Sequence, residues 1–132
     1  MAPVEPACPL CQRARDGALV CENTRAVAFY DGYPVSPGHT LIVPRRHVAD
    51  LFALSREEQQ ALWELLPVVK NALERAHSPA GFNIGVNVGQ AAGQTVAHVH
   101  VHVIPRYHGD VADPRGGVRR VIPDRADYWS AS

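Results

Sequence analysis

The chain has 132 residues, and a prior of about one domain per 150 residues indicates a single domain. Lysine plus arginine number 13 and aspartate plus glutamate number 13, so the formal net charge is zero with histidine neutral. This balance argues against a nucleic-acid-binding protein and against a polybasic membrane-surface protein. No apolar run approaches the roughly 20 residues of a membrane span. The seven histidines are the groups whose charge near neutrality depends on their surroundings.

The N-terminal segment, residues 1–16, is rich in proline and contains Cys8 and Cys11. It has neither the positive flank nor the apolar run of a secretion signal, so we expect a cytoplasmic protein with reduced cysteines. The Cys-x-x-Cys spacing provides half of a tetrahedral zinc site. A redox motif is the alternative, but the residues before the pair offer no preceding strand. Cys21 is interpreted as a buried apolar residue.

Short β-rich segments follow. Residues 18–22 and 25–30 predict a hairpin that turns at Asn23-Thr24. Residues 40–43 predict a buried strand that Pro44 ends, because proline has no N–H for a strand ladder.

A long helix occupies the middle of the chain. Residues 47–54 are predicted to form a short helix before it. Ser55 and Glu58 have the S-x-x-E spacing of a capping box, which marks the start of the long helix. An apolar stripe at helical spacing carries it to about Ala76 or His77. Pro67 should kink this helix, because it lacks an N–H for the helical hydrogen bond.

The C-terminal half returns to strands. Residues 81–88 and 96–104 predict two strands, which a glycine-containing loop over residues 89–95 connects. Residues 118–122 predict a further short strand in the tail. Strands, one long helix and then strands indicate an α+β fold with an antiparallel sheet rather than alternating βαβ units.

Three histidines alternate with valines over residues 98–103. Strand side chains point to alternate faces, so His98, His100 and His102 are predicted to share one face while the valines face the core. A simple polar outer face would more often use threonine, lysine or glutamate. A metal site of this kind usually adds a carboxylate, and this strand has none. Besides a polar outer face and a metal site, the third interpretation of these histidines is a nucleophilic histidine that its neighbours support.

The segments GHTLIVPRRH (38–47) and FNIGVNVGQAAGQTVAHVHVHVIPR (82–106) closely resemble the histidine triad (HIT) superfamily of nucleotide-binding hydrolases and transferases. The family signature, His-φ-His-φ-His-φ-φ with φ apolar, is complete over residues 98–104. The resemblance implies a HIT-like fold, an antiparallel sheet with one long and one short helix. It also implies one domain over residues 1–132, with residues 107–132 as its C-terminal tail.

The resemblance implies a catalytic role for each histidine of the motif. His100 matches the family's nucleophile, which attacks the α-phosphorus of a nucleotide and forms a covalent nucleotidyl-histidine. His102 matches the residue that contacts phosphate. This position is typically glutamine in the transferase and phosphorylase branches, so histidine favours the hydrolase branch, which includes the fragile histidine triad and dinucleoside polyphosphate hydrolases. His98 completes the catalytic set, and His39 matches a buried histidine that supports the triad.

The resemblance also implies a set of substrate-binding residues. The loop before the histidines and Asn87 match the family's phosphate contacts, Asp31 matches a ribose contact, and Phe29 and Leu41 match the base pocket. On local sequence alone, Asn87 is equally a strand-end residue, Asp31 a turn residue, and Phe29 and Leu41 core residues. The loop residues that match are Gly93, Gln94 and Thr95.

A branch of the family carries the cysteine pair with a structural zinc, which implies a metal site formed by Cys8, Cys11, His47 and His98. If zinc takes His98, protonation of the leaving group would fall to Thr95 or to water. The expected function is a nucleotide hydrolase or nucleotidyl transferase that cleaves dinucleoside polyphosphates or nucleoside phosphoramidates. The alternative is a non-catalytic nucleotide-binding protein with structural zinc. Family members of this size usually form homodimers, so a homodimer is expected.

Overall fold

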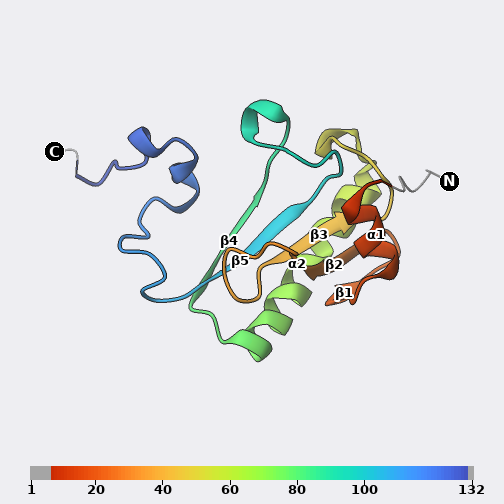
Figure 1. The fold of residues 1–132 in the computed structure, drawn as a ribbon, viewed down its shortest axis with the longest axis horizontal. Helices are drawn as coiled ribbons and strands as arrows, with labels where there is room; N and C mark the ends of the chain where they lie inside the picture. The colour runs from red at the N-terminus through yellow and green to blue at the C-terminus, as the bar shows by residue number, and fades with distance from the viewer. Residues whose placement is uncertain (1–6, 131–132) are drawn as a thin grey trace.

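The computed structural model describes residues 7–130, which form a five-stranded antiparallel sheet with a long helix across its back (Figure 1). The predicted α+β class with an antiparallel sheet is confirmed. Residues 1–6 of the predicted N-terminal segment lie outside the described range. The strands, in the sheet order β1-β2-β3-β5-β4, are β1 (Cys21–Glu22), β2 (Ala26–Tyr30), β3 (Thr40–Pro44), β5 (Val101–Arg106) and β4 (Gly81–Val86).

The long helix α2 (Arg56–His77) begins and ends where the sequence predicts. Ser55 accepts a hydrogen bond from the Glu58 N–H, and the Glu58 carboxylate accepts one from the Ser55 N–H, which completes the capping box. Arg46 donates two 2.8 Å hydrogen bonds to the same carboxylate and lowers the pKa of Glu58 to about 2. The helix continues through Pro67 as one element. None of the described helices is long and apolar enough to cross a membrane.

The two faces of the sheet have different coverings. Ala28, Ile42 and Val101 lie in one cross-strand row and pack against the apolar stripe of α2. The opposite face is covered at β2 and β3 by α1 (Pro9–Asp16), whose Leu10 packs on Phe29 and its neighbours. Proline suits the first turn of α1, because its missing N–H would have no helical partner there. This short helix was not predicted from the sequence.

The histidine segment departs from the predicted strand. Strand β5 begins at Val101 rather than at residue 96, so His98 and His100 precede it. In continued register Val99 would lie opposite Pro44, which has no N–H to donate to a ladder. The Val99 N–H instead donates to the carbonyl of Val48. The alternation nevertheless persists, because Val99, Val101 and Val103 are all buried.

Two shorter predictions are also corrected. Only Leu51–Ala53 forms a 3-10 turn within the helix predicted over 47–54. The strand predicted over 118–122 is a 3-10 turn, Gly117–Val121, followed by a second turn at Pro123–Arg125. Gly116 and Gly117 have positive φ values of 93° and 48°, and this left-handed backbone makes a turn rather than a strand.

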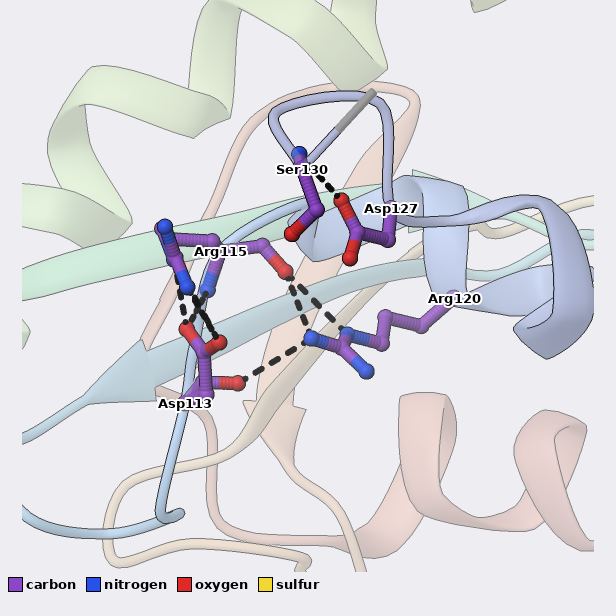
Figure 2. A network of polar contacts seen from close by, with 5 residues as sticks. All are labelled: Asp113, Arg115, Arg120, Asp127 and Ser130. Carbon is purple, nitrogen blue, oxygen red and sulfur yellow. Dashed lines mark hydrogen bonds and ion pairs between the residues drawn. The ribbon is translucent and has the colours of Figure 1, made fainter. Parts of the chain in front are cut away.

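The C-terminal tail is tied together by its own arginines. Arg115 pairs with Asp113 at 3.0 Å, and Arg120 donates to the backbone carbonyls of both residues (Figure 2). The Arg115 guanidinium also lies 4.7 Å from the centre of the Trp129 ring. The tail touches the sheet beside β4, where a Cβ on Gly117 would stand 3.2 Å from the Asn83 amide nitrogen.

Candidate active site and metal centre

Two cysteines and two histidines converge on the α1 face of the sheet. The Sγ atom of Cys11 lies 3.3 Å from Nδ1 of His47 and 3.4 Å from Nδ1 of His98, and the Sγ atom of Cys8 lies 3.5 Å from that same His98 nitrogen. All four atoms lie within 4.8 Å of one another. Cys8, Cys11 and His98 are buried and His47 is half-buried.

This arrangement fits a tetrahedral zinc ion. Zinc–sulfur bonds of about 2.3 Å and zinc–nitrogen bonds of about 2.05 Å at a tetrahedral angle place sulfur and nitrogen about 3.5 Å apart. His98 Nε2 lies 2.8 Å from the Pro44 carbonyl, which can only accept, so this nitrogen carries the proton and Nδ1 holds a free lone pair. Burial lowers the pKa of His98, which favours the neutral ligand form. A backbone carbonyl that fixes the tautomer is the usual partner of a metal-binding histidine.

His100 presents a free ring nitrogen. Its Nδ1 atom lies 2.8 Å from the backbone carbonyl of His98, so Nδ1 carries the proton and donates it. The lone pair of the neutral ring therefore belongs to Nε2. His100 is half-buried and lines a cavity on the α1 face of the sheet, so Nε2 is the nitrogen suited to nucleophilic attack.

His39 and His102 form a directed chain of hydrogen bonds. The Val35 N–H donates to Nδ1 of His39, so Nε2 of the neutral His39 ring carries the proton. This Nε2–H donates to Nδ1 of His102 at 2.9 Å, with the Asp31 carboxylate as a longer second acceptor at 3.4 Å. The proton of neutral His102 then lies on Nε2, where it is available to a ligand.

Burial keeps this chain uncharged. It lowers the pKa of His102 to about 4, and neighbouring His100 and His39 act in the same direction. It also lowers the pKa of His39, with only partial opposition from Asp31. Near pH 7 the neutral His39 ring therefore donates a hydrogen bond to the Asp31 carboxyl group and does not form an ion pair with it.

The cavity beside His100, here the triad cavity, has a volume of about 320 Å³. Its position follows from the strand register, because Phe29, Leu41 and His102 lie directly opposite one another on β2, β3 and β5. Phe29 is thus two strands, or about 10 Å, from His102. Eight of the predicted catalytic and substrate-binding residues line it: Phe29, Asp31, Leu41, Asn87, Gly93, Thr95, His100 and His102.

Three predicted residues lie outside the lining. The Gln94 side chain donates to the carbonyls of Ala49 and Val96 and accepts from the Gly89 N–H, so it fastens the loop rather than facing the cavity. His39 acts behind His102. His98 has both ring nitrogens engaged and no solvent exposure, and its predicted catalytic role stays a prediction.

Arg13 of α1 lines the triad cavity and was not anticipated from the sequence. Its guanidinium carbon lies 4.8 Å from the centre of the Phe29 ring, and Nη2 donates to the Tyr30 carbonyl. Phe29 is 0% exposed and Leu41 only 4%, so Arg13 covers the ring that was expected to meet a base. The sequence did contain a signal for Arg13. Residues 9, 10 and 13 lie beside the Cys-x-x-Cys pair at helical spacing, and all three line the cavity.

Comparison with known proteins identifies the family. The HIT domain model matches residues 12–109, and the chain therefore belongs to the HIT family. An uncharacterised HIT-like protein of Mycoplasma genitalium is 36% identical over 100 residues, which are 76% of this chain and 71% of that protein. The bis(5'-nucleosyl)-tetraphosphatase (asymmetrical) of Schizosaccharomyces pombe is 40% identical over 98 residues, 74% of this chain but 54% of that protein.

Solved structures agree with this assignment. The zinc-bound histidine triad family protein of Mycobacterium smegmatis superposes with a TM-score of 0.72 at 31% identity, covering 81% of this chain and 80% of that one. The Cys8–Cys11–His47–His98 cluster, which can hold a metal, is therefore consistent with membership of a family in which a zinc-bound structure is known.

Proposed function

We propose that the protein is a nucleotide hydrolase that works through a covalent nucleotidyl-histidine on His100. The observation that carries the proposal is the hydrogen bond from His100 Nδ1 to the His98 carbonyl, which leaves Nε2 as a lone-pair nitrogen at the triad cavity. The family supports nucleotide chemistry, and the fission yeast relative is named as a dinucleoside tetraphosphatase. The proposed substrates are dinucleoside polyphosphates and nucleoside phosphoramidates.

The reaction has two displacements. Nε2 of His100 forms a bond to the α-phosphorus while the bond from phosphorus to the leaving group breaks, and the leaving group departs with that electron pair. Water oxygen then attacks the same phosphorus, gives up a proton to solvent, and takes the place of the imidazole as the P–N bond breaks. This releases the nucleoside monophosphate and restores the neutral imidazole. Water protonates the leaving group, or Thr95 passes a proton to it, because both nitrogens of His98 are engaged.

Phosphate charge is met by fixed donors rather than by lysine. His102 supplies the Nε2–H that the chain from Val35 through His39 directs outward. Gly93, Thr95 and Asn87 line the cavity beside it, and Gly93 has a positive φ of 93°, which glycine adopts without strain and without a side chain over the cavity. Donors held in place before the reaction stabilise charge that develops in the transition state.

Zinc, when bound, would hold α1 against the sheet through Cys8, Cys11, His47 and His98. This is a structural role, because four protein ligands leave no open position. Since α1 also contributes Leu10 and Arg13 to the triad cavity, the metal would stabilise one wall of the substrate site.

We also propose a homodimer. Strand β4 is an edge of the sheet, and Ile84 on it is exposed beside an apolar hollow formed with Leu66 and Pro67 of α2. An exposed apolar edge strand is a ready site for pairing with a second chain. Light scattering after size exclusion tests this, and a mass near the monomer's 14.4 kDa would refute it.

The hydrolase proposal is tested by trapping the intermediate. The protein is mixed with diadenosine tetraphosphate or adenosine 5'-phosphoramidate, quenched within milliseconds and analysed by intact-protein mass spectrometry. We expect a nucleotidyl adduct on wild type and none on His100→Gln, with steady turnover only for wild type. Mononucleotide binding without adduct or turnover of either substrate would instead establish a non-catalytic nucleotide-binding protein.

A further inference from the structure

A second cavity of about 390 Å³ adjoins the triad cavity on the same face of the sheet. We call it the Gly85 cavity, and His102 and Asn87 line both cavities while His100 lines only the first. The Gly85 cavity therefore lies next to His102, on the side of the reacting centre that faces away from the nucleophile His100. Its other walls include Val35, Asn83, Gly85, Ile104, Gly117 and Val118.

The glycine is what keeps this cavity open. Gly85 on β4 lies directly opposite His102 on β5, so a side chain there would stand next to the imidazole. A Cβ built at Gly85 meets no atom within 4 Å, and its backbone is not in the left-handed region. Sterics and backbone conformation therefore do not require glycine here. The open space above residue 85 is the consequence of having no side chain.

The lining indicates which chemical group the cavity would hold. Among residues 7–130 its lining includes no aspartate, glutamate, lysine or arginine, and its titratable residues are His39 and His102. Apolar surface comes from Val35, Ile104 and Val118, with amides at Asn83 and Asn87. A mostly apolar hollow with a few polar groups suits a nucleoside, whereas a lone phosphate would require charged donors.

We propose that the Gly85 cavity binds the leaving-group nucleoside of a dinucleoside polyphosphate. The cross-strand row Phe29–Leu41–His102–Gly85 gives the order of the two halves of the substrate. The transferred nucleotide lies on the Phe29 side and the leaving group on the Gly85 side. Attacking and leaving atoms lie roughly in line in phosphoryl transfer, so the leaving group departs away from His100. This inference rests on the proposed hydrolase function and assigns its substrate class.

The C-terminal tail forms one end of the cavity. Gly117 and Val118 belong to the first 3-10 turn of the tail, which the Asp113–Arg115–Arg120 network holds in shape (Figure 2). Val118 is 61% exposed, so a substitution there changes this end of the cavity without disturbing the buried core. Two separate elements, β4 and the tail, can therefore be altered independently.

The test compares two substrates that transfer the same AMP but differ in leaving group. Diadenosine tetraphosphate releases ATP, which carries the second nucleoside, and adenosine 5'-phosphoramidate releases only ammonia. The measured quantity is the ratio of kcat/KM for the first substrate to kcat/KM for the second. Effects on folding, metal content or His100 act on both substrates, so they cancel in this ratio.

Each wall is changed in a variant with a matched control. Gly85→Val fills the cavity, and Gly81→Val on the same strand is its control, since a Cβ there also meets nothing within 4 Å and Gly81 is not a lining residue. Val118→Asp places a negative charge in the cavity. Its control is Val121→Asp on the same turn, where valine is 78% exposed and does not line the cavity.

We expect both cavity variants to lower the ratio at least 10-fold and both controls to keep it within 2-fold of wild type. An unchanged ratio in Gly85→Val and Val118→Asp, with wild type active on both substrates, would overturn the leaving-group assignment. Equal changes in the cavity variants and their controls would overturn it too. Wild-type protein that turns over neither substrate would instead refute the hydrolase function, so the two failures are distinguishable.

Discussion

The Nε2 atom of His39 lies 2.9 Å from Nδ1 of His102, and this contact determines which ring nitrogen of His102 can donate a proton. The direction of this hydrogen bond is set by the backbone, because the Val35 N–H donates to Nδ1, the other ring nitrogen of His39. His39 itself is buried and does not line the triad cavity. In the proposed reaction His39 is therefore a positioning residue, which acts on substrate through His102.

Removing the His39 donor should slow chemistry more than it weakens binding. In His39→Leu, Nδ1 of His102 loses its partner and the outward Nε2–H is no longer enforced, so we expect kcat to fall about 10-fold or more. His39→Gln keeps an amide N–H near the position of Nε2 and should recover part of this loss. Steady-state kinetics with the Kd of a non-hydrolysable nucleotide checks the split. Equal kcat for the leucine and glutamine variants would contradict the assigned direction.

Stability should decrease on acidification through the His102 ring. Its pKa is about 4 in the folded protein, against roughly 6.5 in an unfolded chain. As pH falls from 6.5 towards 4, the unfolded chain takes up a proton that folded His102 refuses, so the free energy of unfolding decreases. His39 contributes with the same sign, because burial also lowers its pKa.

His102→Gln isolates this contribution. Urea unfolding at pH 7.5, 6.0 and 5.0 should show a shallower loss of stability in the variant than in wild type. All other groups, the metal ligands among them, are the same in both proteins, so their contributions cancel in the comparison. Replacing exposed His108 by glutamine controls for the loss of one histidine. A parallel pH dependence in wild type and His102→Gln would contradict the prediction.

The sequence predicted the elements whose signals are local. The Ser55–Glu58 capping box located the start of α2, and the His98–His102 alternation placed valines in the core. The start of β5 was missed because it depends on which residue of β3 lies opposite, and Pro44 ends that ladder. Such a register cannot be read from one strand alone.

The motif predicted eight residues that line the triad cavity, and the differences between that prediction and the structure have long-range causes. Gln94 matched a phosphate loop, but its amide bonds to carbonyls at residues 49 and 96. Arg13 was missed because residues 9–16 were not predicted to form a helix, and that helix lies over Phe29, which is 16 residues away from Arg13 in sequence. The composition could not predict the Gly85 cavity either, because this cavity depends on glycine having no side chain at the position opposite His102.

Loss of one cysteine should remove the metal. In Cys8→Ser we expect metal affinity to fall by at least about 100-fold and stability by roughly 2 kcal/mol or more, about 5–10 °C in Tm. The rate of nucleotidylation at saturating substrate should change less than stability does, because His100 is not a ligand. Elemental analysis of purified protein and thermal unfolding with and without added zinc check these expectations.

Cys21→Ser is the matched control for this prediction. Cys21 lies on β1, away from the metal cluster, and its pKa is raised by burial and by neighbouring Glu22. This variant should keep one equivalent of zinc. Full zinc content in Cys8→Ser would remove Cys8 from the ligand set.

Arg13 should contribute to nucleotide binding through its planar guanidinium. The group lies over Phe29, which is two strands or about 10 Å from His102, on the side of the triad cavity where we propose that the base binds. Among residues 7–130, no carboxylate forms an ion pair with it, so its charge is open to a ligand. Nucleobases stack on arginine planes, and stacking contributes about 1–3 kcal/mol per base.

Arg13→Ala should therefore raise KM for nucleotide substrates about 10-fold while kcat stays within about 2-fold, as measured by steady-state kinetics. Arg13→Lys keeps the charge but loses the plane, so its KM should fall between those of wild type and Arg13→Ala. Arg15→Ala is the control, because Arg15 lies on the same helix, is exposed and pairs with Asp16. If lysine restored wild-type KM in full, charge rather than stacking would explain the role of Arg13. A KM unchanged in Arg13→Ala would exclude the residue from the binding site.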